Sequence, residues 1–144
     1  MNRALLEKEL IRDEGKHLEA YQDSLGYWTI GIGHLLGRER RMTTITEREC
    51  SALFSSDLLI AEMDAIRIVP GFSLLNEVRQ RALVNMAFNL GGSRLHEFRH
   101  FLAAMADQSW VKAGAEMMDS RWATQVGNRA KRLEHMVRTG EVLA

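Results

Sequence analysis

A chain of 144 residues has room for one ordinary globular domain, and hydrophobic residues make up 46% of it, enough to bury a core. A charged fraction of 26% and a single proline exclude an intrinsically disordered or fibrous chain. Nineteen basic residues balance nineteen acidic ones, which disfavours a nucleic-acid binder because such proteins usually carry a basic surface.

The cysteine content and the N-terminal segment indicate where the chain folds. Its one cysteine, Cys50, excludes an internal disulfide and a thiolate-rich zinc cage. The leucines of residues 1–15 are interrupted by charged side chains, so we expect no secretory signal peptide. The single cysteine suits folding in a reducing cytoplasm. No uncharged window reaches the ~18 residues that span a bilayer, so we expect no membrane insertion.

The first elements are a helix and a small sheet. Residues 2–14 carry apolar side chains at helical spacing, which predicts an amphipathic helix that ends at Gly15. Between residues 18 and 36, aromatic and β-branched residues surround a polar turn at residues 23–26. This pattern is typical of a short antiparallel hairpin or a three-stranded sheet.

The second strand of this sheet has two different faces. Thr29, Gly31 and Gly33 share a face with almost no side-chain bulk, which would leave room for a water beneath a bound ligand. Glycines inside a strand often mark a place where a ligand or another backbone comes close. The face expected to pack inward consists of Trp28, Ile30 and Ile32.

The remainder of the chain predicts helices. Thr46 followed by Glu49 forms a capping box, and the helix that it opens should run to about Val69, before the Pro70-Gly71 break. Further helices are expected at residues 74–90, 95–105, 110–118 and 127–139.

These elements predict an α+β fold, mostly helical, in which a long helix joins a small antiparallel sheet lobe to a helical C-terminal lobe across a cleft. We expect one domain over residues 1–144. Its parts would be a sheet lobe at about 15–45, a linking helix at about 46–69 and a helical lobe at about 70–144 together with 1–14.

Two carboxylates and a hydroxyl near the N-terminus suggest glycoside hydrolysis, which needs one protonated and one ionised carboxyl group across a cleft. Glu14 ends a helix, where the helix dipole disfavours its anion, and Asp23 lies in a solvated turn. Thr29 offers a hydroxyl that can hold a water. On spacing alone, a turn former and a solvated charge explain these residues as well, since many acidic pairs exist in the chain.

Other candidate sites have weaker support. His34 favours a structural hydrogen bond or ion pair over a role as a general base. Scattered histidines and the lack of a phosphate-loop motif predict no metal site and no nucleotide cofactor. Residues 121–138 hold five basic side chains against one acidic one, which suits either a polyanion or a solvated helix face. Within this segment, Trp122 could line a sugar site, and Cys50 is expected to be a small buried side chain.

Residues 12–15, 21–23 and 26–36 together resemble the phage-type lysozymes, the family of bacteriophage T4 lysozyme. They supply a Glu, an Asp nine residues later, a Thr six beyond that, and the sequence Thr-Ile-Gly-Ile-Gly-His. The resemblance extends over essentially the whole chain. It continues at residues 45–47, 53–54, 57, 81–82, 85–86, 88–91, 120–122 and 128–132.

The resemblance implies a muramidase that cleaves the β-1,4 bond between N-acetylmuramic acid and N-acetylglucosamine in peptidoglycan by inversion. Glu14 would be the general acid, Asp23 the second carboxylate, and Thr29 a partner that holds the attacking water. Leu35 and Phe88 match positions that line the sugar cleft. His34 and Asp57 match a stabilising ion pair of the family. Arg129 matches a basic residue that faces the catalytic Glu.

Two positions depart from the family pattern, because Phe101 and Glu116 stand where small polar cleft residues are common. By resemblance we expect an endolysin-type monomer without metal or cofactor, made in the host cytoplasm and acting on glycan strands of periplasmic peptidoglycan. A separate holin-type protein would permeabilise the membrane. The alternative is a non-catalytic wall-binding or scaffolding module on the same fold.

Overall fold

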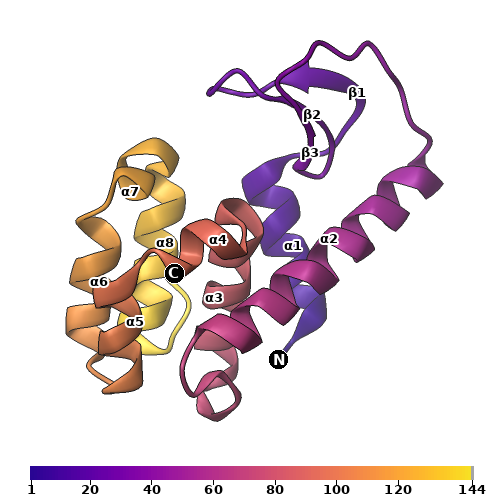
Figure 1. Cartoon of the computed structure of the whole chain (residues 1–144). Helices are drawn as coiled ribbons and strands as arrows, with labels where there is room; N and C mark the ends of the chain where they lie inside the picture. The colour runs from indigo at the N-terminus through magenta and orange to yellow at the C-terminus, as the bar shows by residue number, and fades with distance from the viewer. Residues whose placement is uncertain (144) are drawn as a thin grey trace. The chain divides into compact units, whose positions relative to one another are not determined.

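The computed structural model describes residues 1–143 and confirms a mostly helical α+β fold with a small antiparallel sheet near the N-terminus (Figure 1). Its elements are α1 (Arg3–Glu14), β1 (His17–Gln22), β2 (Trp28–Gly31), β3 (His34–Gly37), α2 (Glu47–Ile68), the 3₁₀ helix η1 (Phe72–Leu74), α3 (Glu77–Leu90), α4 (Gly92–His96), α5 (Arg99–Ala106), α6 (Trp110–Met118), α7 (Arg121–Val126) and α8 (Asn128–Thr139). Among the described residues, no helix is long and apolar enough to cross a membrane.

The chain divides into two compact units, residues 4–60 and residues 1–3 with those from Ala61 onward. The boundary lies inside α2. Residues 4–14 therefore group with the sheet, whereas the sequence assigned them to the helical lobe. Leu6 and Leu10 are the buried residues of this first helix, and both are fully inaccessible to solvent.

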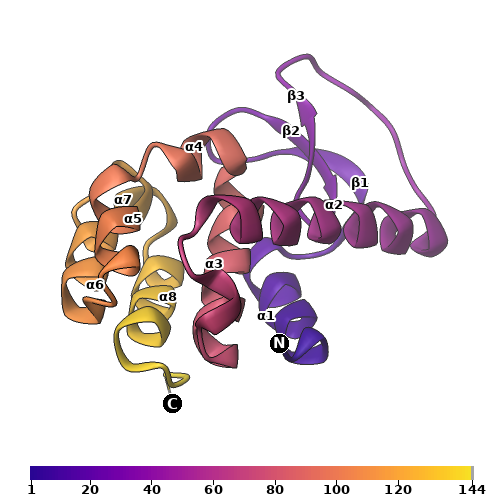
Figure 2. The same cartoon turned by 60° about the horizontal axis from the view of Figure 1, so that its bottom comes forward.

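In the unit of residues 4–60, the predicted helix end, antiparallel sheet and capping box are all present. Gly15 ends α1, and its amide donates to the Ile11 carbonyl at 2.9 Å. The sheet has the antiparallel strand order β1-β2-β3, the longer of the two predicted alternatives, and Figure 2 shows the three strands side by side. Thr46 and Glu49 exchange two hydrogen bonds of 3.1 Å, so the capping box at the start of α2 is confirmed.

The helical unit differs from the sequence prediction at three places. The helix expected at 95–105 is two helices, α4 and α5, because the backbone of Phe98 is not helical and its ring packs edge-on against Trp122. A 3₁₀ turn precedes α3, whose N-cap is Asn76. Helix α7 was missed, although Ser120 caps it by accepting a hydrogen bond from the Ala123 amide at 3.1 Å.

The core of the helical unit lies where α8 contacts α3, α6 and α7, and where α5 contacts α6. Helices α3, α4, α5, α6 and α8 each supply fully buried apolar side chains on one face, and burial of such a face drives helix packing. The largest of them are Leu83, Met86, Leu95, Phe101, Met105, Met117 and Leu133.

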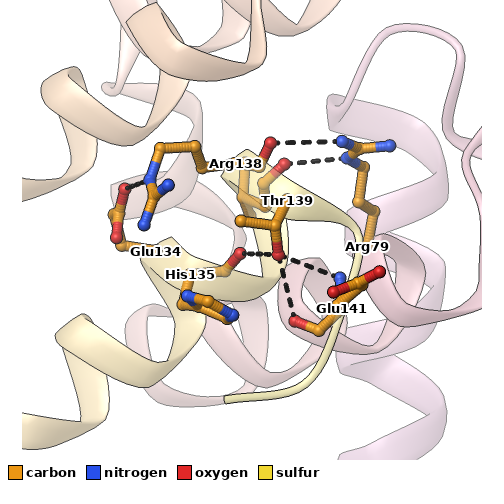
Figure 3. A network of polar contacts seen from close by, with 7 residues as sticks. Arg79, Glu134, His135, Arg138, Thr139 and Glu141 are labelled. Carbon is orange, nitrogen blue, oxygen red and sulfur yellow. Dashed lines mark hydrogen bonds and ion pairs between the residues drawn. The ribbon is translucent and has the colours of Figure 1, made fainter.

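Arg79 of α3 closes the C-terminal end of α8. Its Nε donates to the Val137 carbonyl at 2.8 Å and its Nη2 to the Arg138 carbonyl at 3.3 Å, as Figure 3 shows. These carbonyls lack partners within the helix, so the guanidinium satisfies them. The guanidinium also lies 4.1 Å from the ring centre of Trp110, within cation–π range.

Replacing Arg79 by Ala should lower the free energy of unfolding by about 2–3 kcal/mol, because two charge-assisted hydrogen bonds and the cation–π contact are lost together. Urea denaturation measures this change. The matched control is Arg138→Ala, which removes one ion pair to Glu134 from a half-exposed side chain and should cost at most about 0.5 kcal/mol. Equal losses in the two variants would contradict the capping role.

Candidate active site

Asp23 is held in the turn between β1 and β2. Its Oδ1 accepts hydrogen bonds from the amides of Leu25 at 2.9 Å and Tyr27 at 2.8 Å. The turn is closed by the Asp23 amide, which donates to the Tyr27 carbonyl at 2.7 Å. Both side-chain bonds end on Oδ1. Within the described residues nothing donates to Oδ2, so this oxygen keeps its lone pairs for water or substrate.

Glu14, the last residue of α1, lies against the backbone of Gly33. A Cβ built on Gly33 would be 2.8 Å from the Glu14 Cδ and 3.0 Å from its Cγ, closer than real side chains approach. Gly33 also has a φ of +66°, which L side chains rarely adopt. The sequence predicted a ligand or another backbone close to this glycine, with room for a water, but the group that approaches is the carboxyl of Glu14.

Gly31 was expected to leave room for water together with Gly33, and this is wrong. A Cβ on Gly31 would meet the Cys50 Sγ at 3.4 Å and the Ile45 Cδ1 at 3.6 Å, so Gly31 faces the core. The expectation treated residues 28–33 as one strand, but β2 ends at Gly31 and residues 32–33 form the turn to β3. Gly31 and Gly33 both have positive φ, so the alternation of faces does not hold there. Cys50 is 1% exposed, in agreement with its predicted role as a small buried side chain.

Thr29 lies in the middle of β2, where it pairs with Tyr21 of β1 and Leu35 of β3. Its side chain is buried, with a relative exposure of 6%. The Thr29 hydroxyl donates a long hydrogen bond of 3.3 Å to the Tyr27 carbonyl. This bond uses the hydroxyl hydrogen and leaves the oxygen lone pairs to accept from another group.

His34 and Asp57 are brought together, with 2.7 Å between Nδ1 and Oδ2. Both side chains are about one-quarter exposed, and the pair fastens β3 to α2. Leu35, the next residue, is 59% exposed although it lies in a strand. It therefore presents an apolar side chain to solvent on the same sheet that carries Thr29.

The other sequence-predicted residues, Phe88, Trp122 and Arg129, belong to the helical unit. Phe88 is half-buried in α3, and Arg129 is 7% exposed and donates from Nε to the Asn85 Oδ1 at 3.0 Å. Trp122 is only 2% exposed, and its indole N–H donates to Asn89 at 2.6 Å. The prediction that Trp122 lines a sugar site is therefore wrong, because the ring is a core residue.

Comparison with known proteins assigns the family. A family model described as phage lysozyme matches residues 12–139. The chain belongs to the phage lysozyme family. It is 32% identical to probable T4-type lysozyme 1 of Dictyostelium discoideum, across 95% of this chain and 96% of that protein.

Further relatives are phage proteins. The pre-baseplate central spike protein Gp5 of Enterobacteria phage T4 is 34% identical across 92% of this chain, which spans 27% of that longer protein. The endolysin of Salmonella phage P22 is 35% identical across 74% of this chain and 81% of its own length. This chain thus resembles most of one short phage protein and part of a longer one.

Tyr21 is a residue of this phage lysozyme that the sequence did not single out as functional. Burial raises the pKa of its phenol above the ordinary value, and the carboxylates of Glu14 and Asp23 raise the pKa further. Both carboxylates therefore act on one tyrosine. The sequence signals were its position two residues before Asp23, near the end of β1, and its place in the matched residues 21–23.

The positions that depart from the family pattern lie together. Phe101 is buried and Glu116 half-buried, and both line a hollow of about 300 Å³ in the helical unit. The other lining residues are Glu97, Phe98, Arg99, His100, Asp119 and Ser120. No group of three or more His, Cys, Asp or Glu side chains within residues 1–143 is placed to hold a metal ion.

Proposed function

We propose that this phage lysozyme is a muramidase, which hydrolyses the β-1,4 bond between N-acetylmuramic acid and N-acetylglucosamine in peptidoglycan. The observation that carries the proposal is the placement of Glu14 against the bare backbone of Gly33, in the same compact unit as the amide-held carboxylate of Asp23. The names of its relatives, lysozyme and endolysin, support the same reaction class.

Glu14, Asp23 and Thr29 each have a chemical task in this mechanism. Glu14 donates its proton to the glycosidic oxygen as the bond to the anomeric carbon breaks. A water attacks that carbon from the opposite face and gives its proton to the free Oδ2 of Asp23. The Thr29 oxygen accepts the second hydrogen of the water and holds it in place.

Leu35 and Phe88 are proposed to contact the saccharide, the first from an exposed position on β3 and the second from α3. Apolar side chains suit the faces of sugar rings because those faces carry C–H groups. Arg129 is proposed, by the same resemblance, as a further substrate-binding residue. His34 and Asp57 then act as a structural pair that holds β3 on α2.

The anomeric configuration of the first product tests the role of the water. Hydrolysis of the β-linked substrate by direct attack of water should release the α anomer first, by inversion. Proton NMR of the anomeric signals within the first minutes of digestion, before mutarotation, measures this outcome. A β anomer appearing first would mean that Asp23 forms a covalent glycosyl intermediate, and the role of Thr29 would be refuted with it.

A non-catalytic wall-binding or scaffolding module is the alternative function. Such a module would not need a carboxyl group that lies directly against a glycine. Any side chain in place of Gly33 would displace the Glu14 carboxyl. Clearing of outer-membrane-permeabilised Gram-negative cells distinguishes the two functions. A muramidase lowers the turbidity at catalytic protein concentrations, whereas a binding module leaves it unchanged.

The biological setting is proposed from the same resemblance. We propose an endolysin-type monomer that acts on periplasmic peptidoglycan in host-cell lysis. A separate holin-type protein would permeabilise the membrane and give the enzyme access to the wall. Purified protein added from outside reaches the wall without a holin. It should therefore lyse intact cells only after the outer membrane has been permeabilised.

A further inference from the structure

Tyr21 lies opposite Thr29 in the pairing of β1 with β2. Directly opposed residues of an antiparallel pair point to the same face of the sheet, with their Cβ atoms ~4.5–5.5 Å apart. The side chain of Tyr21 therefore leaves the sheet beside the hydroxyl that the proposed mechanism uses to hold water. An irregularity in the strand pairing between His17 and Tyr21 sets this register.

The tyrosine ring is held in position by its neighbours. Its centre lies 4.3 Å from that of the His17 ring, with an angle of 47° between the planes. The His17 ring in turn occupies space beside Gly15, because a Cβ on Gly15 would be 3.1 Å from the His17 Nε2. Tyr21 is thus braced against the segment that directly follows Glu14.

The phenol of Tyr21 is a neutral hydrogen-bond donor in a negatively charged setting. Burial is the main cause that raises the pKa of the phenol, and the charges of Glu14 and Asp23 raise the pKa further. The phenol therefore keeps its proton at neutral pH. Within residues 1–143 the Tyr21 hydroxyl makes no hydrogen bond to another side chain or to the backbone, although the side chain is half-buried. The O–H group is therefore available to a bound molecule.

We propose that the Tyr21 hydroxyl donates a hydrogen bond to the attacking water and so acts as a further catalytic residue of the reaction described under the proposed function, on which this inference rests. The water has two hydrogens and two lone pairs. Its hydrogens go to Asp23 Oδ2 and Thr29 Oγ1. One lone pair accepts from Tyr21, and the other remains free to form the bond to the anomeric carbon while Asp23 takes the proton.

Tyr21→Phe tests this role because it removes only the hydroxyl and keeps the ring against His17. With soluble, uncross-linked peptidoglycan chains as substrate, we expect kcat to fall about 10- to 100-fold and KM to change less than about twofold. The melting temperature should stay within about 2 °C of the wild type. Thr29→Val, which removes another partner of the water, should show the same division between kcat and KM.

Ser24→Ala is the matched control, since it removes an exposed hydroxyl from the turn of the same hairpin and should retain the wild-type kcat. An unchanged kcat in Tyr21→Phe would overturn the proposal. A rise in KM alone would overturn it as well, because the hydroxyl would then contact the saccharide and not the water.

A titration tests the placement of Tyr21 independently of activity. In a Tyr27→Phe background, Tyr21 is the only tyrosine, because the chain has two. We expect its pKa, followed by ultraviolet absorbance, to fall when Glu14→Gln or Asp23→Asn is added, and not when Glu19→Gln is added. A pKa that moves in neither active-site variant refutes the placement of Tyr21, whereas an inactive wild-type protein refutes the proposed function.

Discussion

Glu14→Gln should fold like the wild-type protein and lose nearly all lytic activity. The amide has the size of the carboxyl group but cannot give a proton to the departing sugar oxygen, and general acid catalysis contributes ~10²–10⁴ in rate. Turbidity clearing of permeabilised cells measures the loss, and circular dichroism with thermal melting checks the fold. We expect at least about a hundredfold decrease in the initial clearing rate.

The matched control for Glu14→Gln is Glu7→Gln, which makes the same change elsewhere on α1, at a half-buried position. Its clearing rate should stay within about twofold of the wild type, because surface substitutions away from a site change little. A Glu14→Gln protein that clears cells at the wild-type rate would show that this carboxyl group donates no proton in the reaction.

Gly33→Ala should reduce activity about a hundredfold while leaving the protein folded. The new methyl group would lie 2.8 Å from the present position of the Glu14 Cδ, so the flexible glutamate side chain must move. Misplacement of a catalytic group by ~1 Å can cost ~10² in rate. The positive φ of +66° adds a cost of about 1–2 kcal/mol to the free energy of unfolding.

Gly71→Ala separates these two effects, because Gly71 has a φ of +68° and no atom within 4 Å of its Cβ position. This control should lose similar stability, about 1–2 kcal/mol in urea denaturation, and keep wild-type turnover. If both alanine variants lost activity equally, strain in the backbone and not displacement of Glu14 would explain the result.

Features fixed by neighbouring residues could be predicted from the sequence. The capping box of Thr46 and Glu49 and the helix end at Gly15 depend on hydrogen bonds a few residues apart, and both were correct. The break at Phe98 was not predicted, since it depends on packing against Trp122, which is distant in the chain. The same packing explains why Trp122 is a core residue and not a surface for sugars.

The site shows a similar division. Glu14, Asp23 and Thr29 are predicted as site residues from spacing and resemblance. The missing side chain of Gly33 predicted a close approach of a ligand or backbone, whereas the structure places the Glu14 carboxyl there. Alternation along a strand placed Gly31 on the same open face, but positive φ at both glycines turned Gly31 toward Cys50. Tyr21 was missed because the regular strand pattern did not predict which residue it pairs with.

The pairing of Tyr21 with Thr29 follows an irregular register after His17, and that register is a property of the folded sheet. A pattern of alternating residues assumes regular pairing, so it cannot show which side chains meet across such an irregularity. Sequence reasoning therefore proposed the residues that carry chemical motifs and did not single out Tyr21, whose proposed role depends on its cross-strand partner.

The reducing end released from purified peptidoglycan tests the central proposal most directly. Sacculi digested with the wild-type protein are reduced with borohydride, hydrolysed in acid and analysed for amino-sugar alcohols. We expect the reduced form of muramic acid to accumulate, because cleavage after N-acetylmuramic acid exposes that sugar as the new reducing end. Accumulation of reduced glucosamine, or of free amino groups from cut peptides without any reduced sugar, would contradict the assignment as a muramidase.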